Sequence, residues 1–168
     1  MDDFRELNKR LILTPFPLPN IRDLRDLVLC DVKYFTTLDI LQGYYQLKLS
    51  PQSSDICTIV VPWGKFCYNS LPMGVASSPD LFQWALGDLF LDIQNVLIYL
   101  DNILIVLHGH FKKRLHIINQ VLHCSNNKNM TLSAKKSEWA KSTDHYLGFI
   151  LSQDGIRPKK QKSKQYNK

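Results

Sequence analysis

The sequence predicts an α+β fold with a mostly antiparallel sheet and helices on one face. Three observations lead to this prediction. Several segments alternate in polarity or concentrate β-branched and aromatic residues, as strands do, while three others repeat apolar residues at helical spacing. The elements follow the order strand, helix, hairpin, helix, strand, without the regular βαβα alternation of a parallel sheet. A ferredoxin-like core is the economical architecture for this order.

Length and composition indicate one globular domain. The chain has 168 residues, of which 45% are hydrophobic and 21% charged, so it can bury a core and is not disordered or fibrous. Its four cysteines form no C-x-x-C pair, which argues against a disulfide framework or a cysteine zinc site. The first residues lack signal-peptide features, and the longest apolar stretch, residues 96–107, is too short for a bilayer span. We expect no secretion and no membrane partner.

The first third of the chain contains a connector, a helix and two strand segments. Prolines at alternate positions of residues 15–19 enforce an extended connector. Asn20 then caps a short amphipathic helix over residues 21–28. Residues 34–41 and 46–49 are β-branched, aromatic or alternating, so we predict two strands around a tight bend.

Two hairpins and two helices follow. Residues 56–61 and 66–68 are predicted to pair across a turn containing Pro and Gly. A helix over residues 78–90 has Ser at its cap and Pro at its first position. The strands 96–100 and 103–107 are separated by two residues, which is hairpin spacing.

The last part of the chain is predicted to form one helix and several short strands. An apolar stripe predicts the helix over residues 111–123, which a run of asparagines ends at 126–129. Short strands lie on either side of an Asp154-Gly155 turn.

Two acids are the main candidates for chemistry. Asp39 and Asp101 each lie in an apolar strand context, where a carboxylate is costly to bury without a partner or a cation. Each has an ordinary explanation taken alone, because Asp-Asn is a favoured turn pair and strand-end acids bond to backbone amides. Two carboxylates together at one end of an antiparallel sheet would instead make an oxygen-rich site of the kind Mg²⁺ prefers.

Other catalytic signatures are missing from the sequence or incomplete. It has no phosphate-binding P-loop, no nucleophile elbow and no dinucleotide-binding glycine motif. Residues 133–136 match the S-x-x-K pattern without its companion motifs, so their two lysines are expected to be ordinary loop charges.

Six motifs together resemble the reverse transcriptase domain of retroviral-type polymerases, most closely that of Ty3/gypsy-like LTR retrotransposons. They occur in the order and at the spacing typical of that family. The motifs are Asp3-Phe4-Arg5-Glu6-Leu7-Asn8-Lys9; the proline connector 15–19; Phe35-Thr36-Thr37-Leu38-Asp39 with Gly43-Tyr44-Tyr45-Gln46; Leu71-Pro72-Met73-Gly74 with Ser78-Pro79 and Phe82-Gln83; Tyr99-Leu100-Asp101-Asn102; and Leu147-Gly148-Phe149 with Asp154-Gly155-Ile156.

The resemblance implies a right-hand polymerase palm with partial fingers over residues 1–156. Such an enzyme is an RNA-directed DNA polymerase that joins a dNTP to a primer 3′-hydroxyl on an RNA or DNA template. It uses two Mg²⁺ ions, for which Mn²⁺ can substitute, and Asp39 and Asp101 would be their direct ligands. Its other implied partners are further segments of a Pol polyprotein, and its implied place is a cytoplasmic particle or the nucleus.

The resemblance also assigns roles to four other residues. Tyr44 would lie under the incoming sugar and exclude a 2′-hydroxyl, and Met73 and Gly74 would lie against the nucleotide and template. Arg5 would help to hold the template. From the sequence alone, core or turn positions are the favoured explanations for Tyr44, Met73 and Gly74.

Asn102 departs from the family pattern, because the family carries a third carboxylate at this position. An amide retains one oxygen but loses the charge that helps to hold two dications. The sequence also lacks the family's triphosphate-clamping Lys and Arg and its thumb, connection and RNase H segments. We therefore expect impaired activity, and the alternative is a non-catalytic remnant that keeps the fold and binds nucleic acid or protein.

The net charge of +6 is unevenly distributed. Residues 157–168 hold six basic side chains and no acid, so residues 1–156 carry 15 of each sign. We interpret residues 157–168 as a solvated basic tail, outside the polymerase-like domain. Any nucleic-acid contact by the domain must come from local patches, such as Arg5, Lys9 and Arg10.

Overall fold

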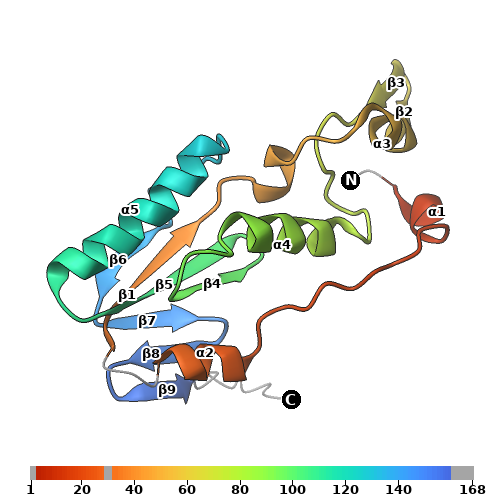
Figure 1. Ribbon diagram of the computed structural model, residues 1–168. Helices are drawn as coiled ribbons and strands as arrows, with labels where there is room; N and C mark the ends of the chain where they lie inside the picture. The colour runs from red at the N-terminus through yellow and green to blue at the C-terminus, as the bar shows by residue number, and fades with distance from the viewer. Residues whose placement is uncertain (1–2, 29–31, 160–168) are drawn as a thin grey trace, which may run out of the picture.

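A computed structural model describes residues 3–28 and 32–159 of the chain (Figure 1). None of the helices in this part is long and apolar enough to cross a bilayer. In chain order, the elements are α1 (Arg5–Asn8), α2 (Ile21–Val28), β1 (Val32–Asp39), the 3₁₀ helix η1 (Gly43–Gln46), α3 (Pro51–Ile56), β2 (Thr58–Val61), β3 (Gly64–Cys67), α4 (Ser78–Leu89), β4 (Val96–Tyr99), β5 (Asn102–His108), α5 (Phe111–Asn127), β6 (Glu138–Lys141), β7 (Thr143–Tyr146), β8 (Phe149–Ser152) and β9 (Gly155–Pro158).

A four-stranded antiparallel sheet is the centre of the fold. Its strands lie in the order β4-β5-β1-β6. Along the chain, the sheet and its helices follow the order β1, α4, β4, β5, α5, β6, which is the β-α-β-β-α-β arrangement of a ferredoxin-like core. The predicted fold class is therefore confirmed.

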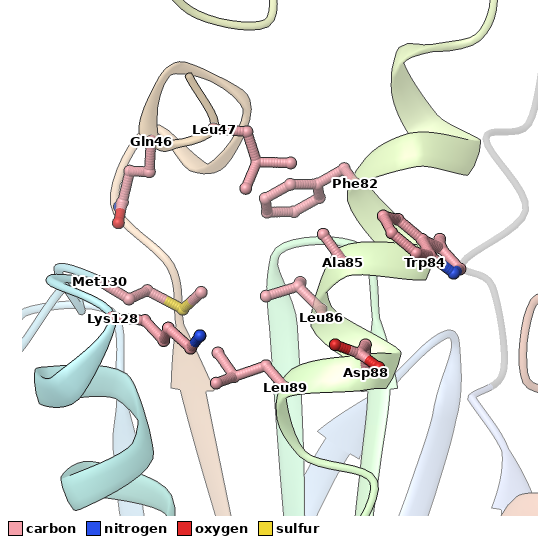
Figure 2. A pocket seen from close by; sticks show the side chains of 10 residues that line it. All are labelled: Gln46, Leu47, Phe82, Trp84, Ala85, Leu86, Asp88, Leu89, Lys128 and Met130. Carbon is pink, nitrogen blue, oxygen red and sulfur yellow. The ribbon is translucent and has the colours of Figure 1, made fainter. Parts of the chain in front are cut away.

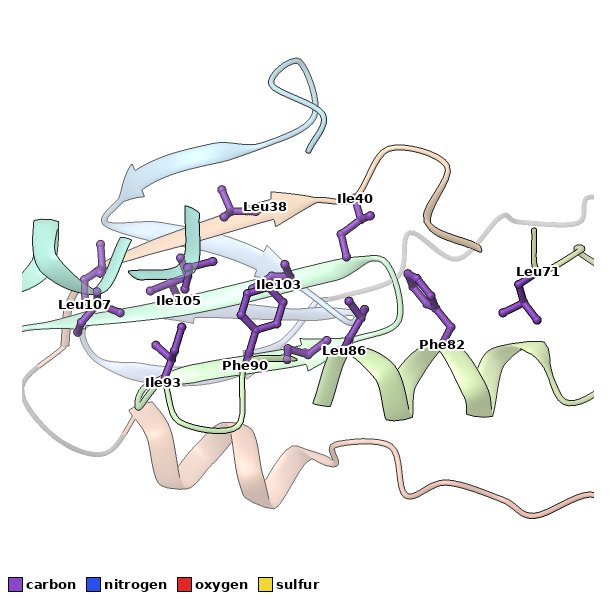
Figure 3. Close-up of a cluster of buried hydrophobic side chains, with 13 residues drawn as sticks. Leu38, Ile40, Leu71, Phe82, Leu86, Phe90, Ile93, Ile103, Ile105 and Leu107 are labelled. Carbon is purple, nitrogen blue, oxygen red and sulfur yellow. The ribbon is translucent and has the colours of Figure 1, made fainter. Parts of the chain in front are cut away.

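The alternation of β5 divides the core between the two sheet faces. Ile103 and Ile105 point to the face covered by α4 and α5, where Phe82 and Leu86 pack against them (Figure 3). Leu104 points to the opposite face, into a cluster that α2 and the β7-β8-β9 sheet complete. Each fully buried apolar side chain contributes about 1.5–3 kcal/mol to folding, and five consecutive residues of β5 are buried. The prediction of helices on one face thus describes α4 and α5 but not α2.

A smaller lobe lies beyond the end of α4, away from the four-stranded sheet (Figure 1). It consists of α1, α3 and the β2–β3 hairpin. Phe4, Cys57 and Val75 form its buried core. This lobe is small because each of its elements is only four to six residues long.

Two local predictions were wrong. Residues 46–49 are not a strand but make a single bridge, between Lys48 and Ser70, because the chain turns through η1 first. Helix α3 was missed although its start carries the usual signals: the Ser50 side chain accepts a hydrogen bond from Ser53 N, and Pro51 follows the cap.

Several boundaries also differ from the prediction, those of α5 and β9 among them. Helix α5 continues to Asn127, and the chain leaves it at Asn129, whose φ of 55° is the left-handed conformation that asparagine tolerates at helix ends. Strand β9 includes Arg157 and Pro158, so the predicted boundary at residue 156 falls inside a strand. The rest of the predicted basic tail, residues 160–168, lies outside the described residues.

Candidate active site

The β4–β5 hairpin presents Asp101 at its tip. Tyr99 and Asn102 are its last paired residues, so the two-residue turn is Leu100-Asp101 and not Asp101-Asn102 as predicted. Leu100 has a φ of 50°, a conformation that costs a bulky residue about 1–2 kcal/mol but suits the twist of a two-residue hairpin. The hairpin was therefore predicted correctly and its turn misplaced by one residue.

Gln83 of α4 holds this strained turn in place. Its side-chain Nε2 donates a hydrogen bond to the Ile98 carbonyl at 2.8 Å, and its Oε1 accepts one from Leu100 N at 2.8 Å. Gln83 is only 3% exposed, so both of its polar groups depend on these backbone partners. The helix thereby fixes the position from which Asp101 projects.

Asp39 lies beside the hairpin tip, at the end of β1. It stands opposite Asn102 in the β1–β5 ladder, and the next residue, Ile40, donates its N–H to the Asp101 carbonyl at 2.8 Å. The register of one antiparallel pair thus brings Asp39, Asp101 and Asn102 to the same end of the sheet. The backbone therefore brings together the two strand ends at which the sequence places the acids.

The carboxylate of Asp39 is nearly buried and lacks a hydrogen-bond donor at one oxygen. Its side chain is 13% exposed, and its buried Oδ1 accepts no hydrogen bond from the described residues. Lys136 Nζ lies 3.4 Å from this oxygen, which makes an ion pair without hydrogen-bond geometry. An oxygen left open in this way suits a hard divalent cation.

Asp101 adds a second carboxylate. Its Oδ1 accepts a hydrogen bond from the Asn102 side-chain amide at 3.2 Å, so Asn102 engages the neighbouring acid as a donor. Within residues 3–28 and 32–159, no group of three or more His, Cys, Asp or Glu side chains is arranged to hold a metal ion. In this part of the chain, Asp39 and Asp101 are therefore the candidate carboxylates of the site.

Tyr44 and Tyr146 are both close enough to Asp101 to be affected by its charge. Burial raises the pKa of the Tyr44 phenol, and the negative charge of Asp101 raises it further. Burial also raises the pKa of Tyr146, with smaller contributions from Tyr99, Asp101 and Asp144, and its hydroxyl donates to the Asn102 carbonyl at 3.4 Å. Both phenols are neutral at physiological pH.

The Tyr44 ring packs against the ring of Phe82. The two ring centroids are 5.0 Å apart, an ordinary tilted aromatic contact. A Cβ atom on the preceding Gly43 would lie 2.5 Å from Phe82 Cζ, so any other residue there would force the Phe82 ring to shift. Gly43 lets η1 approach α4 closely enough to present Tyr44 toward Asp101.

Met73, Gly74 and Arg5 lie in a second group at the smaller lobe. Gly74, with a φ of 102°, offers its carbonyl to Asn8 Nδ2 at 2.9 Å, and Asn8 Oδ1 accepts from Ala76 N at 2.8 Å. Met73 is 51% exposed on this loop. The predicted site residues thus fall into an aspartate group and a lobe group.

Arg5 is bonded to an acid of its own segment. Its guanidinium donates to both oxygens of Asp3, at 2.6–3.1 Å, and these hydrogen bonds lower the pKa of the Asp3 carboxyl to about 2. Both side chains are well exposed.

Three residues with positioning roles were not identified from the sequence. Gln83 and Asn8 belong to the motifs quoted above, but nothing in a single sequence shows that their amides hold distant backbone. Lys136 was interpreted as an ordinary loop charge. Its contact with Asp39 joins segments almost a hundred residues apart, so no local pattern signals it.

A groove of about 260 Å³ lies between α4 and the segment that contains Gln46 and Leu47 (Figure 2). Gln46 and Leu47 border it on one side, and Trp84 and Asp88 of α4 on the other. Phe82, which supports Tyr44, forms part of its wall. Neither Asp39 nor Asp101 lines the groove, so it is distinct from the aspartate group.

Sequence comparison relates the chain to polymerase polyproteins. A family model described as "Reverse transcriptase (RNA-dependent DNA polymerase)" matches residues 1–151. The chain is 32% identical over 167 residues to the retrovirus-related Pol polyprotein from transposon gypsy of Drosophila melanogaster, which covers 96% of this chain and 16% of that protein. It is 32% identical over 158 residues to the enzymatic polyprotein of Cestrum yellow leaf curling virus, covering 91% and 24%. The chain spans less than a quarter of the length of these relatives.

Structural comparison points to the same group of proteins. The native Prototype Foamy Virus protease-reverse transcriptase matches with a TM-score of 0.73 and 28% identity, over 93% of this chain and 20% of that chain. The foamy viral protease-reverse transcriptase dRH in complex with ds DNA matches with a TM-score of 0.83 and 24% identity, over 93% and 27%. At this lower identity, the second match establishes likeness of fold.

Proposed function

The chain belongs to the reverse transcriptase (RNA-dependent DNA polymerase) family, and on that premise we propose that it performs RNA-directed DNA synthesis as part of a Pol polyprotein. The convergence of Asp39 and Asp101 at one end of the sheet is the observation that carries the proposal. Two carboxylates on a rigid ladder suit nucleotidyl transfer, which depends mainly on positioning and charge stabilisation.

Asp39 and Asp101 would hold the divalent ions, Mg²⁺ by preference and Mn²⁺ in its place. The buried Oδ1 of Asp39 supports this assignment, because it is a hard oxygen donor that accepts no hydrogen bond from the described residues. When bound, such ions activate a primer 3′-hydroxyl and stabilise charge at the nucleotide α-phosphate. The register of β1 with β5, which sets Asp39 opposite Asn102, supports a shared site for the two acids.

Substrate positioning would fall to the two residue groups described above. The neutral Tyr44 ring, supported by Phe82, would pack under the dNTP sugar and exclude a 2′-hydroxyl. Met73 and Gly74 would contact the nucleotide and template. Arg5 would bind a template phosphate by exchanging its exposed partner Asp3 for it.

The template would be RNA or DNA. A solved foamy viral protease-reverse transcriptase holds an RNA/DNA hybrid, and another holds ds DNA, which supports both possibilities. Residues 1–156 would supply the palm and part of the fingers. The other functions of the polyprotein would lie in further segments of it.

Asn102 would lower the catalytic rate. It replaces a charge beside two dications with an amide that already bonds to Asp101. Altering a residue around a metal site usually costs about 10- to 100-fold in activity, and loss of a charge this close should cost at least that.

Primer extension on an RNA template, with Mg²⁺ or Mn²⁺, tests the proposal. We expect Asn102→Asp to extend the primer at least about tenfold faster than the natural chain. Asp101→Asn in the Asn102→Asp background should abolish extension and serves as the control. Equal rates for the natural chain and Asn102→Asp would refute the role of Asn102. Extension that survives Asp101→Asn would refute the proposed site.

A further inference from the structure

Lys136 forms an ion pair with Asp39, one of the two proposed metal ligands. We propose that Lys136 takes the place of a divalent cation on Asp39 when no metal is bound, and that it competes with the metal for this carboxylate. The inference rests on the proposed function, because it takes Asp39 to be a metal ligand. In this proposal Lys136 acts through Asp39, and so as a positioning residue.

The segment 133–137 is fastened to the backbone of Asp39 on both sides. Ser133 N donates to the Asp39 carbonyl at 2.7 Å, and Asp39 N donates to Ser137 Oγ at 3.2 Å. The Ser137 hydroxyl in turn donates to the Ser133 carbonyl at 2.7 Å, which closes the segment into a tight turn. Lys136 lies within this turn, so its backbone is fixed at a position from which the side chain reaches the Asp39 carboxylate.

Charge balance explains why a cation is needed at this position. The Oδ1 atom of Asp39 is buried and accepts no hydrogen bond from the described residues, and a buried carboxylate without a partner is costly. The Lys136 ammonium at 3.4 Å supplies the compensating charge. Its side chain is 67% exposed and flexible, so it can move into solvent when another cation arrives.

Asn102 makes the competition more effective. With only Asp39 and Asp101 charged, the pair carries a formal charge of −2, which Lys136 reduces to −1. A third acid at position 102 would make the site more negative and the lysine less influential. The Lys136 charge therefore has a larger effect on cation binding when position 102 is Asn than when it is an acid.

Direct binding of Mn²⁺, followed by electron paramagnetic resonance of the free ion, tests the proposal. We expect Lys136→Gln to bind Mn²⁺ roughly three- to tenfold more tightly, because the removed charge repels a doubly charged ion at short range. Lys136→Arg should bind like the natural chain. Lys135→Gln is the matched control: it removes the same charge from the neighbouring exposed lysine and should change affinity by less than about twofold.

Thermal unfolding supplies a readout without metal. In a chelator, Lys136→Gln should have a lower Tm than Lys135→Gln, because only the first leaves the Asp39 carboxylate uncompensated. Added Mn²⁺ should raise the Tm of Lys136→Gln more than that of the natural chain.

The outcomes separate this proposal from the proposed function. If Lys136→Gln matches Lys135→Gln in affinity and Tm while Asp39→Asn abolishes Mn²⁺ binding, Lys136 does not compete and the metal site stands. If Asp39→Asn binds Mn²⁺ like the natural chain, Asp39 is not a ligand and both proposals fail.

Discussion

Asn102 lies opposite Asp39 and beside Asp101, so its side chain affects the charge balance of all three positions. As an amide it donates to Asp101, whereas an aspartate there would repel both neighbours in the absence of metal. Like charges placed directly across a sheet are destabilising. The amide thus favours the stability of the metal-free protein.

Tyr146 gives a prediction about pH at the residue scale. Burial raises its pKa above that of the unfolded chain, so folding favours the neutral phenol. The stability this provides is fully present below pH 10, near the unfolded pKa, and is lost as the pH rises through the folded pKa. Urea unfolding at a series of alkaline pH values should show this fall.

The Tyr146→Phe variant isolates the effect. It removes the titrating group, so its unfolding free energy should fall less steeply above pH 10 than that of the natural chain. At neutral pH it should lose about 0.5–1.5 kcal/mol with the hydrogen bond to the Asn102 carbonyl. Tyr45→Phe, which changes an exposed ring, is the control. An identical alkaline slope for Tyr146→Phe and the natural chain would contradict the prediction.

At the element scale, α4 controls the position of the β4–β5 hairpin. Its buried face packs on the sheet through Phe82 and Leu86, and Gln83 between them reaches the backbone on both sides of Tyr99. Packing and polar bonding from one helix therefore place Tyr44 and Asp101 together. A shift of α4 would therefore displace both Tyr44 and Asp101.

Gln83→Leu tests the link between helix and hairpin. It leaves the Ile98 carbonyl and the Leu100 N–H without their partner, so the unfolding free energy should fall by about 2–4 kcal/mol in urea titration. Asp39-dependent Mn²⁺ binding should weaken as the turn relaxes. Gln120→Leu, on the exposed face of α5, is the matched control and should change stability by less than about 0.5 kcal/mol. Equal stabilities for the two variants would show that Gln83 does not hold the turn.

At the scale of the whole molecule, the smaller lobe meets the Met73–Ala76 loop through Asn8. Two hydrogen bonds from one side chain join α1 to the loop that leads into α4. A Cβ atom on Gly74 would lie 3.4 Å from the Phe4 ring. The centroids of the Phe4 and Tyr68 rings are 5.9 Å apart. The positions of the predicted nucleotide-contacting residues Met73 and Gly74 therefore depend on the position of α1.

Asn8→Ala should loosen this connection. It removes both bonds, so backbone amides of residues 74–76 should exchange hydrogen faster, while those of β5 should not change. The stability loss should be about 1–2 kcal/mol. Asn119→Ala on the exposed surface of α5 is the control. Unchanged exchange at residues 74–76 would mean that the two hydrogen bonds do not hold the loop.

Much of the fold could be predicted because its signals are local. Apolar periodicity located α4, α5 and the β4–β5 hairpin, and the order of elements gave the ferredoxin-like core. The same reasoning failed at residues 46–49, where alternation suggested a strand but the preceding turn through η1 left only one bridge. Periodicity describes which side of a segment is apolar, and not whether a partner strand is within reach.

The sequence by itself determined the family motifs, the two acids at strand ends and the amide at position 102. Only the tertiary structure decided which residues form the hairpin turn, that Gln83 and Asn8 hold distant backbone, and that Lys136 faces Asp39. The reason is physical. Motifs and periodicity are properties of neighbouring residues, whereas each of these contacts joins segments far apart in the chain and exists only once the sheet register is fixed.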